Sequence, residues 1–329
     1  MEVPCVRVPR EEGESVRQQL ADVDAIDRDY RISSDDGSIF IPVRTTEALP
    51  TDHPIVSHEV TPRNRQQLPR DLIDGDVSYE RLGDIALIDE DDPDRARELS
   101  NAMMASALPI ETVLNRRSKI EGEYRVRDWE VLAGEETETI HREFGASFAV
   151  DVTKAYFSPR LATERHRVIG QVTPGECVFD MFAGVGPFAI PMAMAGASVV
   201  ATDVNPDAIA YLRENADRNG VADHVTAINE DVNDVASEHA GWADRIVMNL
   251  PHTADQFLDA AETIAGDTCR LHYYDIQSDV DPFGPGESAI QDALGETFEI
   301  DVVTRREVRS YAPHEVNVCL DVDLRRRVM

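Results

Sequence analysis

The alternation of hydrophobic and polar positions changes character near residue 169. From there to the C-terminus, short apolar runs typical of β-strands alternate with segments that have the apolar spacing of helices. This pattern predicts an α/β domain with a mostly parallel, doubly wound sheet, whose last two strands are antiparallel because little sequence separates them. The predicted strands are residues 177–182, 198–204, 225–231, 245–250, 270–276, 299–308 and 315–324, and the predicted helices are 187–194, 206–219 and 288–294.

The N-terminal part of the chain is predicted to be a small separate domain, residues 1–62. It has one predicted helix at residues 13–23 and one short predicted strand at Ile39–Val43. The polar, proline-containing segment 61–71 that follows indicates a linker.

A central domain of α+β type, residues 63–168, is predicted between the linker and the α/β domain at 169–329. Its clearest strand is residues 80–88. After an acidic turn at 89–94, a helix is expected through residues 96–108.

Composition excludes several classes of protein. The 329 residues suit two or three domains, and a hydrophobic content of 42% excludes wholesale disorder. No apolar stretch approaches the roughly 20 residues of a membrane span, and we expect no signal peptide because residues 1–15 lack an apolar core. Four scattered cysteines without a CxxC pair argue against a cysteine-rich zinc site and suit the reducing cytoplasm.

The net charge of −31 needs a separate explanation. Of 32 basic residues, only Lys119 and Lys154 are lysine. Abundant Asp and Glu with almost no Lys indicate adaptation to high salt, so the charge does not argue against a nucleic-acid partner. Residues 112–170 are neutral, with 10 basic and 10 acidic residues, and are the best candidate surface for a polyanion. Local pairing of those arginines with the acidic residues is the alternative.

The end of the first strand of the α/β domain carries a glycine loop. Gly184 and Gly186 allow positive φ and close approach of a ligand, and Pro187 suits the first position of a helix. Such a loop follows the first strand in doubly wound sheets that bind a cofactor beyond the carboxyl ends of the strands.

Two cofactors fit this loop. The spacing Gly184-x-Gly186-x-x-Ala189, with Asp203 at the end of the next strand, formally matches a dinucleotide fingerprint. Asp180 would repel a pyrophosphate but would suit the ammonium group of S-adenosylmethionine, which we therefore favour over NAD. The motif Asn249-Leu-Pro251 supports this choice because methyltransferases place such a polar side chain beside the acceptor nitrogen. The predicted cofactor-binding residues are Asp180, Phe182, Ala183, Gly184, Gly186, Asp203, Val204, Asp231, Asn249 and Pro251.

Several segments resemble the archaeal and eukaryotic tRNA guanine-37 N1-methyltransferases. They are KAYFSPRLATER (154–165), DMFAGVGPF (180–188) and NLP (249–251), with GEYRVR (122–127), HYYDI (272–276) and SYAP (310–313). The resemblance covers roughly residues 80–325 and implies a class I, Rossmann-like S-adenosylmethionine methyltransferase. It implies methyl transfer to N1 of guanosine 37 in tRNA, with the N-terminal domain helping to hold the tRNA body.

The resemblance also implies roles for individual residues. Guanine N1 carries a proton at neutral pH, and Glu164 occupies the position of the general base that removes it. Spacing alone instead favours Glu164 as an ion-pair partner of Arg160, Arg165 or Arg167. The residue that stabilises negative charge on O6 is Arg125, with Arg127 as the alternative. Asn249 would hold the guanine edge, and Tyr156, with Phe157, would position or stack the base.

Other functions remain open at this level. A close alternative is the wyosine-pathway aminocarboxypropyltransferase, which uses the same cofactor, or a bifunctional relative that also methylates the imidazopurine intermediate. A tRNA-binding protein without catalysis would need neither Glu164 nor the carboxylates at the strand ends. We expect a cytoplasmic monomer that acts on tRNA, with no metal, no membrane association and no obligate protein partner.

Overall fold

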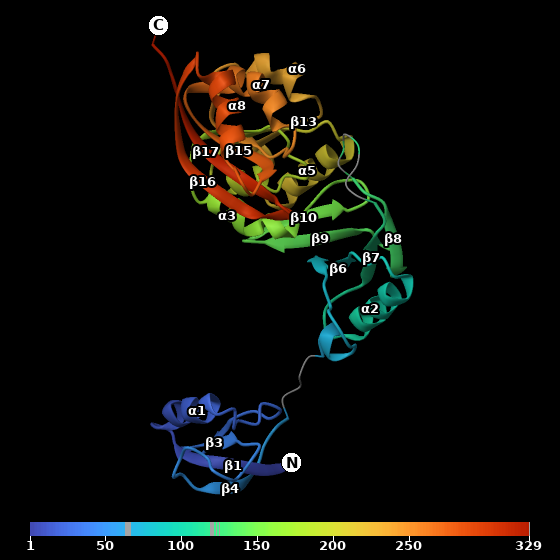
Figure 1. Ribbon diagram of the computed structural model, residues 1–329, viewed down its shortest axis with the longest axis vertical. Helices are drawn as coiled ribbons and strands as arrows, with labels where there is room; N and C mark the ends of the chain where they lie inside the picture. Colours follow the sequence, from blue (N-terminus) through green and yellow to red (C-terminus); the bar gives the residue numbers. More distant parts are fainter. Residues whose placement is uncertain (63–66, 119–121, 123, 125, 329) are drawn as a thin grey trace. The chain divides into compact units, whose positions relative to one another are not determined.

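The computed structural model describes residues 1–62, 67–118, 122, 124 and 126–328, which form two compact units (Figure 1). The first unit is Met1–Asp71 and the second is Leu72–Met329. The predicted Arg125 lies outside the described residues. The three predicted domains, 1–62, 63–168 and 169–329, stay a prediction.

The first unit is a four-stranded sheet covered by one helix. Its strand order is β2-β3-β1-β4, and Val6, Leu20 and Ile41 are fully or almost fully buried in its core. The predicted helix and the strand near Ile39 are confirmed, whereas the central strand β1 was not predicted. Its Pro4 lacks an N–H donor and disfavours a central strand in the sequence pattern. The elements are β1 (Glu2–Pro9), α1 (Gly13–Asp22), β2 (Ser33–Asp35), β3 (Ser38–Pro42) and β4 (Ile55–Glu59).

The second unit begins with a four-stranded sheet of order β5-β6-β7-β8. The single strand predicted at 80–88 is a hairpin, because the chain reverses at Gly83 with φ +57°. Helix α2 begins at Pro93 and ends at Ala105, each three residues before the expected bound. The Asp92 side chain caps its start by accepting a hydrogen bond from the N–H of Asp94. The elements are β5 (Glu80–Leu82), β6 (Ile85–Ile88), α2 (Pro93–Ala105), β7 (Thr112–Arg116) and β8 (Trp129–Ala133).

A hairpin follows, β9 (Glu138–Glu143) and β10 (Ala146–Asp151), and it is tied to the larger α/β part of the unit (Figure 1). The side-chain amide of Asn215 accepts from the N–H of Ala149 at 2.7 Å and donates to its carbonyl at 3.1 Å. Asn219 makes the same pair of hydrogen bonds with Ser147. These amides extend the hydrogen bonding of β10 as a neighbouring strand would, which anchors the hairpin to helix α5 (Pro206–Arg218) and its C-terminal end.

The α/β part contains a seven-stranded sheet of order β13-β12-β11-β14-β15-β17-β16. Its first five strands are parallel, and β17 is antiparallel to both neighbours, which confirms the predicted topology. The elements are α3 (Ala162–Ile169), β11 (Cys177–Asp180), α4 (Ala189–Met194), β12 (Ser198–Thr202), α5 (Pro206–Arg218), β13 (Val225–Ile228), α6 (Val232–Val235), β14 (Ala243–Met248), α7 (Leu258–Ile264), β15 (Ala265–Ser278), α8 (Gly284–Leu294), β16 (Phe298–Ala312) and β17 (Glu315–Arg326).

Hydrophobic cores form on both faces of this sheet. Val178 packs with α4, α5 and β10, whereas the next residue, Phe179, packs with α6, α7 and α8. Successive side chains of a strand point to opposite faces, so a strand buried on both faces has a continuous apolar run. The helices therefore cover both faces, as the predicted doubly wound architecture requires.

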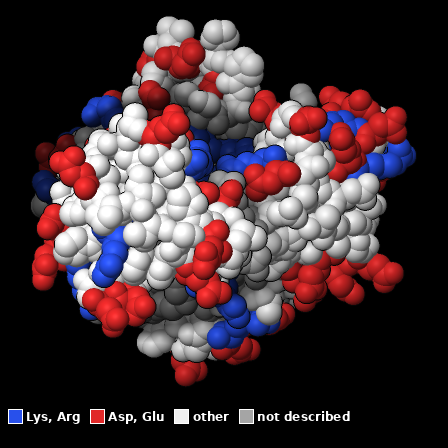
Figure 2. Space-filling model, turned by 90° about the horizontal axis from the view of Figure 1, so that it is seen from below, with Lys and Arg blue, Asp and Glu red and all other residues white. Residues whose placement is uncertain are grey.

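The surface is strongly acidic, in agreement with the net charge. Figure 2 shows acidic side chains scattered over the visible face, with basic side chains in a few small groups. No helix among the described residues is long and apolar enough to cross a membrane.

Candidate active site

A cavity of about 720 Å³ lies at the carboxyl ends of the parallel strands. This is the edge where doubly wound sheets bind ligands, and the volume suits a small-molecule site. The walls combine the strand ends of the α/β sheet with the β10–α3 connection and with residues of β7 and β8. The predicted site residues that line it are Tyr156, Phe182, Ala183, Gly184, Asp203, Val204, Asp231, Asn249 and Pro251.

Asp203 holds the glycine loop in place. Its Oδ2 accepts a hydrogen bond from the N–H of Gly184 at 2.8 Å, and its Oδ1 accepts one from the N–H of Asn205 at 2.9 Å. Burial raises the pKa of Asp203, although these two N–H groups oppose the rise. Each carboxylate oxygen keeps a second lone pair, so Asp203 can both shape the loop and accept a hydroxyl from a ligand.

Gly186 does not line the cavity and instead allows close packing beneath the loop. It has φ +93°, and a Cβ there would lie 2.4 Å from Leu212 Cδ1 and 2.8 Å from Ile190 Cγ1. The side chains of Ile190 on α4 and Leu212 on α5 therefore occupy the space that a Cβ at Gly186 would need.

Replacing Gly186 by Ala is expected to destabilise the protein by about 2–4 kcal/mol, because overpacking adds to the cost of positive φ. Unfolding in denaturant at constant salt measures this. Gly220→Ala is the matched control, since Gly220 has φ +69° but open space around its Cβ position. Equal losses in the two variants would show that packing against Leu212 is unimportant.

Asp180 lies beneath the loop, outside the cavity lining. It is 1% exposed, and neither carboxylate oxygen has a hydrogen-bond partner of good geometry among the described residues. Burial and the nearby Asp203 raise its pKa to about 7, although the N–H groups of Phe182 and Ala189 oppose the rise. An ionised carboxylate without a partner in such a place calls for a cationic group from a ligand.

Polar residues also follow the strands β13 and β14. Asp231 lines the cavity and also begins helix α6, where its Oδ1 accepts from the N–H of Asn233 at 2.8 Å. The position of Asp231 is therefore compatible with both capping of α6 and contact with a ligand. Asn249 and Pro251, which follow β14, both line the cavity.

Both residues of the aromatic pair in the β10–α3 connection line the cavity, but they differ in exposure. Tyr156 lines the cavity and is 37% exposed. Phe157 is buried against Phe148, and the Arg165 guanidinium lies 5.1 Å from its ring centroid. Tyr156 is therefore the more accessible ring of this pair for stacking.

Arg127 also lines the cavity. Its guanidinium lies 5.6 Å from the ring centroid of Trp129. Burial lowers the pKa of Arg127, and the positive charge of the neighbouring Arg116 lowers it further. Of the two arginines considered for O6, this is the one that the structure describes.

Glu164 is buried among cations and does not line the cavity. Its Oε1 accepts from Tyr274 at 3.1 Å and from Arg167 at 2.7 Å, and Arg306 Nε lies 2.8 Å from Oε2. Arg167 is one of the three pairing partners that spacing suggested, whereas Arg306 was not anticipated.

Some groups at the site are identified only by tertiary contacts. Arg165 makes a bidentate ion pair with Glu143 at 2.7 and 2.6 Å and donates to the carbonyl of Ser158 at 3.1 Å, which fixes the β10–α3 connection. Across the cavity, β16 and β17 contribute Tyr311 and Asn317. The SYAP segment signalled Tyr311 by resemblance, but nothing local signalled Asn317.

One buried group has metal-binding chemistry, His272, Cys319 and Asp321. Its donor atoms are already hydrogen-bonded: His272 Nδ1 lies 2.7 Å from Asp321, and Nε2 lies 2.7 Å from Arg245. Burial raises the pKa of the Cys319 thiol well above its ordinary value, so it stays protonated. The group is consequently better described as part of a hydrogen-bonded network than as a metal site.

Comparison with known proteins agrees with this geometry. The family model for the TRM5/TYW2 methyltransferase domain matches residues 139–292, and models for the tRNA methyltransferase 5 and TYW2 N-terminal domains match residues 5–47 and 65–137. The Pyrococcus abyssi tRNA (guanine(37)-N(1))-methyltransferase Trm5b is 38% identical over 336 residues, covering 96% of this chain and 98% of the relative. The chain belongs to the TRM5/TYW2 methyltransferase family.

Two further similarities bear on function. A solved structure of aTrm5 with tRNALeu aligns with a TM-score of 0.73 and 31% identity, covering 97% of this chain and 99% of that one. The Pyrococcus horikoshii tRNA(Phe) (4-demethylwyosine(37)-C(7)) aminocarboxypropyltransferase is 33% identical over 273 residues, covering 80% of this chain and 96% of the relative. The predicted class I methyltransferase fold is thereby confirmed.

Proposed function

We propose that this protein transfers a methyl group from S-adenosylmethionine to N1 of guanosine at position 37 of tRNA. The observation that carries the proposal is one cavity that joins the glycine loop and strand-end acids to Tyr156 and Arg127. Similarity to a tRNA (guanine(37)-N(1))-methyltransferase over almost the whole chain supports the same activity.

The residues present fit S-adenosylmethionine, which supplies a methyl group on a positively charged sulfur. Asp180 is buried, and no side chain among the described residues donates a hydrogen bond to it, so it suits the ammonium group. Asp203 suits the ribose hydroxyls, and Asp231 suits further polar atoms of the nucleoside. The loop residues Phe182, Ala183 and Gly184 let the backbone approach the cofactor closely, and Val204 and Pro251 provide apolar wall.

The acceptor needs a base for the N1 proton. Glu164 is our candidate, and its buried carboxylate is placed by α3 one turn from Leu161, which lines the cavity. To accept the proton, Oε2 has to exchange Arg306 for guanine. The Arg306 side chain is 43% exposed, so it can leave with little loss of buried contact.

The other acceptor contacts follow from the cavity walls. Tyr156 stacks on the base, which has to leave the anticodon stack to enter the cavity. The Asn249 amide, with one donor and one acceptor side, holds the guanine edge. Arg125 is the candidate for O6 by resemblance, and Arg127 is the alternative that lines the cavity.

Aminocarboxypropyl transfer from the same cofactor is the second candidate function. The match to the TYW2 N-terminal domain at residues 65–137 favours it locally. Against it stand the match to the tRNA methyltransferase 5 N-terminal domain and the Asn249-Leu-Pro251 motif. We further propose that the protein is a cytoplasmic monomer whose acidic surface suits high salt.

The test is nucleoside mass spectrometry after reaction in molar potassium chloride with tRNA carrying G or A at position 37. We expect 1-methylguanosine with G37 and no product with A37. An aminocarboxypropyl adduct would favour the second candidate function, and a product that is independent of the base at position 37 would overturn the assignment.

A further inference from the structure

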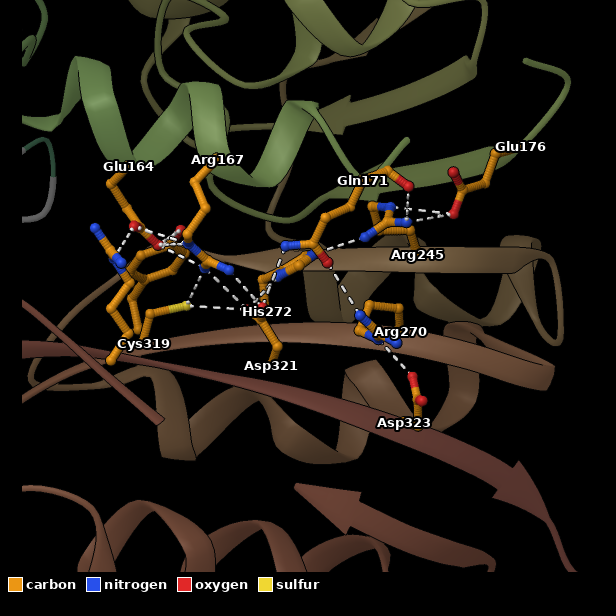
Figure 3. A network of polar contacts seen from close by, with 12 residues as sticks. Glu164, Arg167, Gln171, Glu176, Arg245, Arg270, His272, Cys319, Asp321 and Asp323 are labelled. Atoms are coloured by element: carbon orange, nitrogen blue, oxygen red, sulfur yellow. Dashed lines mark hydrogen bonds and ion pairs between the residues drawn. The ribbon is translucent and has the colours of Figure 1, made fainter. Parts of the chain in front are cut away.

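A chain of buried charges extends from α3 into the seven-stranded sheet (Figure 3). It joins Glu164 and Arg167 of α3 to Asp321 of β17, His272 of β15 and Arg245 of β14. Glu164, Asp321 and His272 are 3%, 1% and 0% exposed. Burying charges in this way costs desolvation free energy and is weak evidence for stability, so a role besides stability is worth testing.

Arg167 is shared between the two carboxylates. It donates to Oε1 and Oε2 of Glu164 at 2.7 and 3.0 Å, and to Oδ2 and Oδ1 of Asp321 at 2.5 and 3.0 Å. Burial opposes its charge, but the hydrogen bonds with Asp321 and Glu164 raise the pKa of Arg167 above its usual value. One planar guanidinium thus fixes the orientation of the Glu164 carboxylate.

The far side of Arg167 is held in turn. Asp321 accepts from His272 Nδ1 at 2.7 Å, and Arg245 donates to His272 Nε2 at 2.7 Å. Burial lowers the pKa of His272, so the imidazole is neutral, with its proton on Nδ1. His272 and Arg167 hold the pKa of Asp321 well below its usual range in spite of its burial. Asp321 therefore stays ionised and keeps Arg167 in place.

The two oxygens of Glu164 face different surroundings. Oε1 accepts from the Tyr274 hydroxyl, which is 1% exposed, whereas Oε2 faces Arg306, whose side chain is 43% exposed. Among the described partners, Arg306 is the most exposed. Oε2 is therefore the oxygen that a substrate can reach by replacing a partner.

We propose that Arg167, held by Asp321 and His272, is a positioning residue that fixes Glu164 so that Oε2 is presented to the acceptor base. This inference rests on the proposed function, with Glu164 as the general base. Arg167 itself does not touch the substrate. Its effect on the reaction passes entirely through Glu164.

The first test is a double-mutant cycle on the full-length protein, with single-turnover methylation of G37 tRNA as the readout. Arg167→Lys keeps the charge but cannot bridge both carboxylates, so we expect a rate loss of about tenfold with unchanged cofactor affinity. In a Glu164→Gln background the same substitution should have no further effect. An equal fold loss in both backgrounds would overturn the inference. Arg305→Lys is the control. Arg305 is next to Arg306 on β16 but pairs with Glu287 of α8 instead of Glu164.

The second test uses the pH–rate profile. Charged or titratable groups facing Glu164 are Arg167 on α3, Tyr274 on β15, Arg306 on β16, and Cys319 and Asp321 on β17. Burial raises the pKa of Tyr274 and of Cys319 well above their ordinary values, so neither produces an acidic limb.

Arg167→Gln removes a cation beside Glu164, so the acidic limb of the pH–rate profile should move to higher pH. Asp321→Asn leaves Arg167 wholly to Glu164, so the limb should move to lower pH. If the two substitutions move the acidic limb in the same direction, or if neither moves it, the inference is overturned. If the Asp321→Asn protein does not fold, the double-mutant cycle with Arg167→Lys decides alone. A wild-type protein that fails to methylate G37 would instead reject the proposed function.

Discussion

Replacing Glu164 by Gln is expected to lower the single-turnover rate of G37 methylation by about 10²–10³-fold, the usual size of a general-base contribution. Gln keeps the volume and an acceptor for Tyr274 and Arg167, but it cannot take the N1 proton. The dissociation constant of S-adenosylmethionine should change by no more than about twofold, because Glu164 does not line the cavity.

The control is Glu287→Gln, which removes a carboxylate from an exposed ion pair with Arg305. It should leave the rate unchanged. A Glu164→Gln protein that retains most of its rate, or that loses cofactor binding to the same extent as rate, would remove Glu164 from the role of base. A pairing role with Arg167 and Arg306 would then be its main function.

Replacing Asp180 by Asn is expected to have two opposite effects. S-adenosylmethionine should bind about 100-fold more weakly at pH 8, because a buried charge-assisted contact is lost. The cofactor-free protein should melt at a higher temperature, because the folded state no longer holds an unpartnered buried carboxylate.

The pH dependence follows from a pKa of about 7 for Asp180, raised from 3.8 by burial and Asp203. The pKa of Asp180 is higher in the folded state than in the unfolded state. Its contribution to the free energy of unfolding is therefore fully present below the pKa of the unfolded state and is lost as pH rises through 7. The advantage of Asp180→Asn should therefore be present at pH 8 and vanish towards pH 4.

Cofactor affinity of the wild-type protein should fall about tenfold from pH 8 to pH 6 as Asp180 is protonated. Calorimetric titration at several pH values measures this. The Asp180→Asn protein should show little such dependence, and Asp244→Asn, at the opposite edge of the sheet, should behave as wild type. A pH dependence that survives in Asp180→Asn would assign it to another group.

Local pattern was a good guide where local chemistry decides the structure. Strands buried on both faces must be continuously apolar, so β11 and β12 were found with their neighbouring helices. Positive φ and close approach both demand glycine, so Gly184 and Gly186 located the cofactor loop. The pattern failed for β1, whose Pro4 disfavours a strand until β3 and β4 pair with it on both sides.

Side-chain partners were harder to predict, because they come from segments far apart in the sequence. Glu164 and Arg167 are three residues apart and their pairing was foreseeable. Asp321 lies 154 residues beyond Arg167, and no local signal indicates that it shares the same guanidinium. The same holds for Arg165 and Glu143, which face each other only because β9 pairs with β10 and α3 packs nearby.

The sequence by itself determined the class of the protein: the succession of strands in the α/β domain, the glycine loop, the acids at the strand ends and the family motifs. The tertiary structure alone decided which of those acids touch the cavity. It buried Asp180 without a partner, gave Asp203 the loop to hold, and surrounded Glu164 with Arg167 and Arg306. The physical reason is that periodicity and backbone conformation are local properties, whereas burial, pKa and ion pairing depend on what the fold brings close.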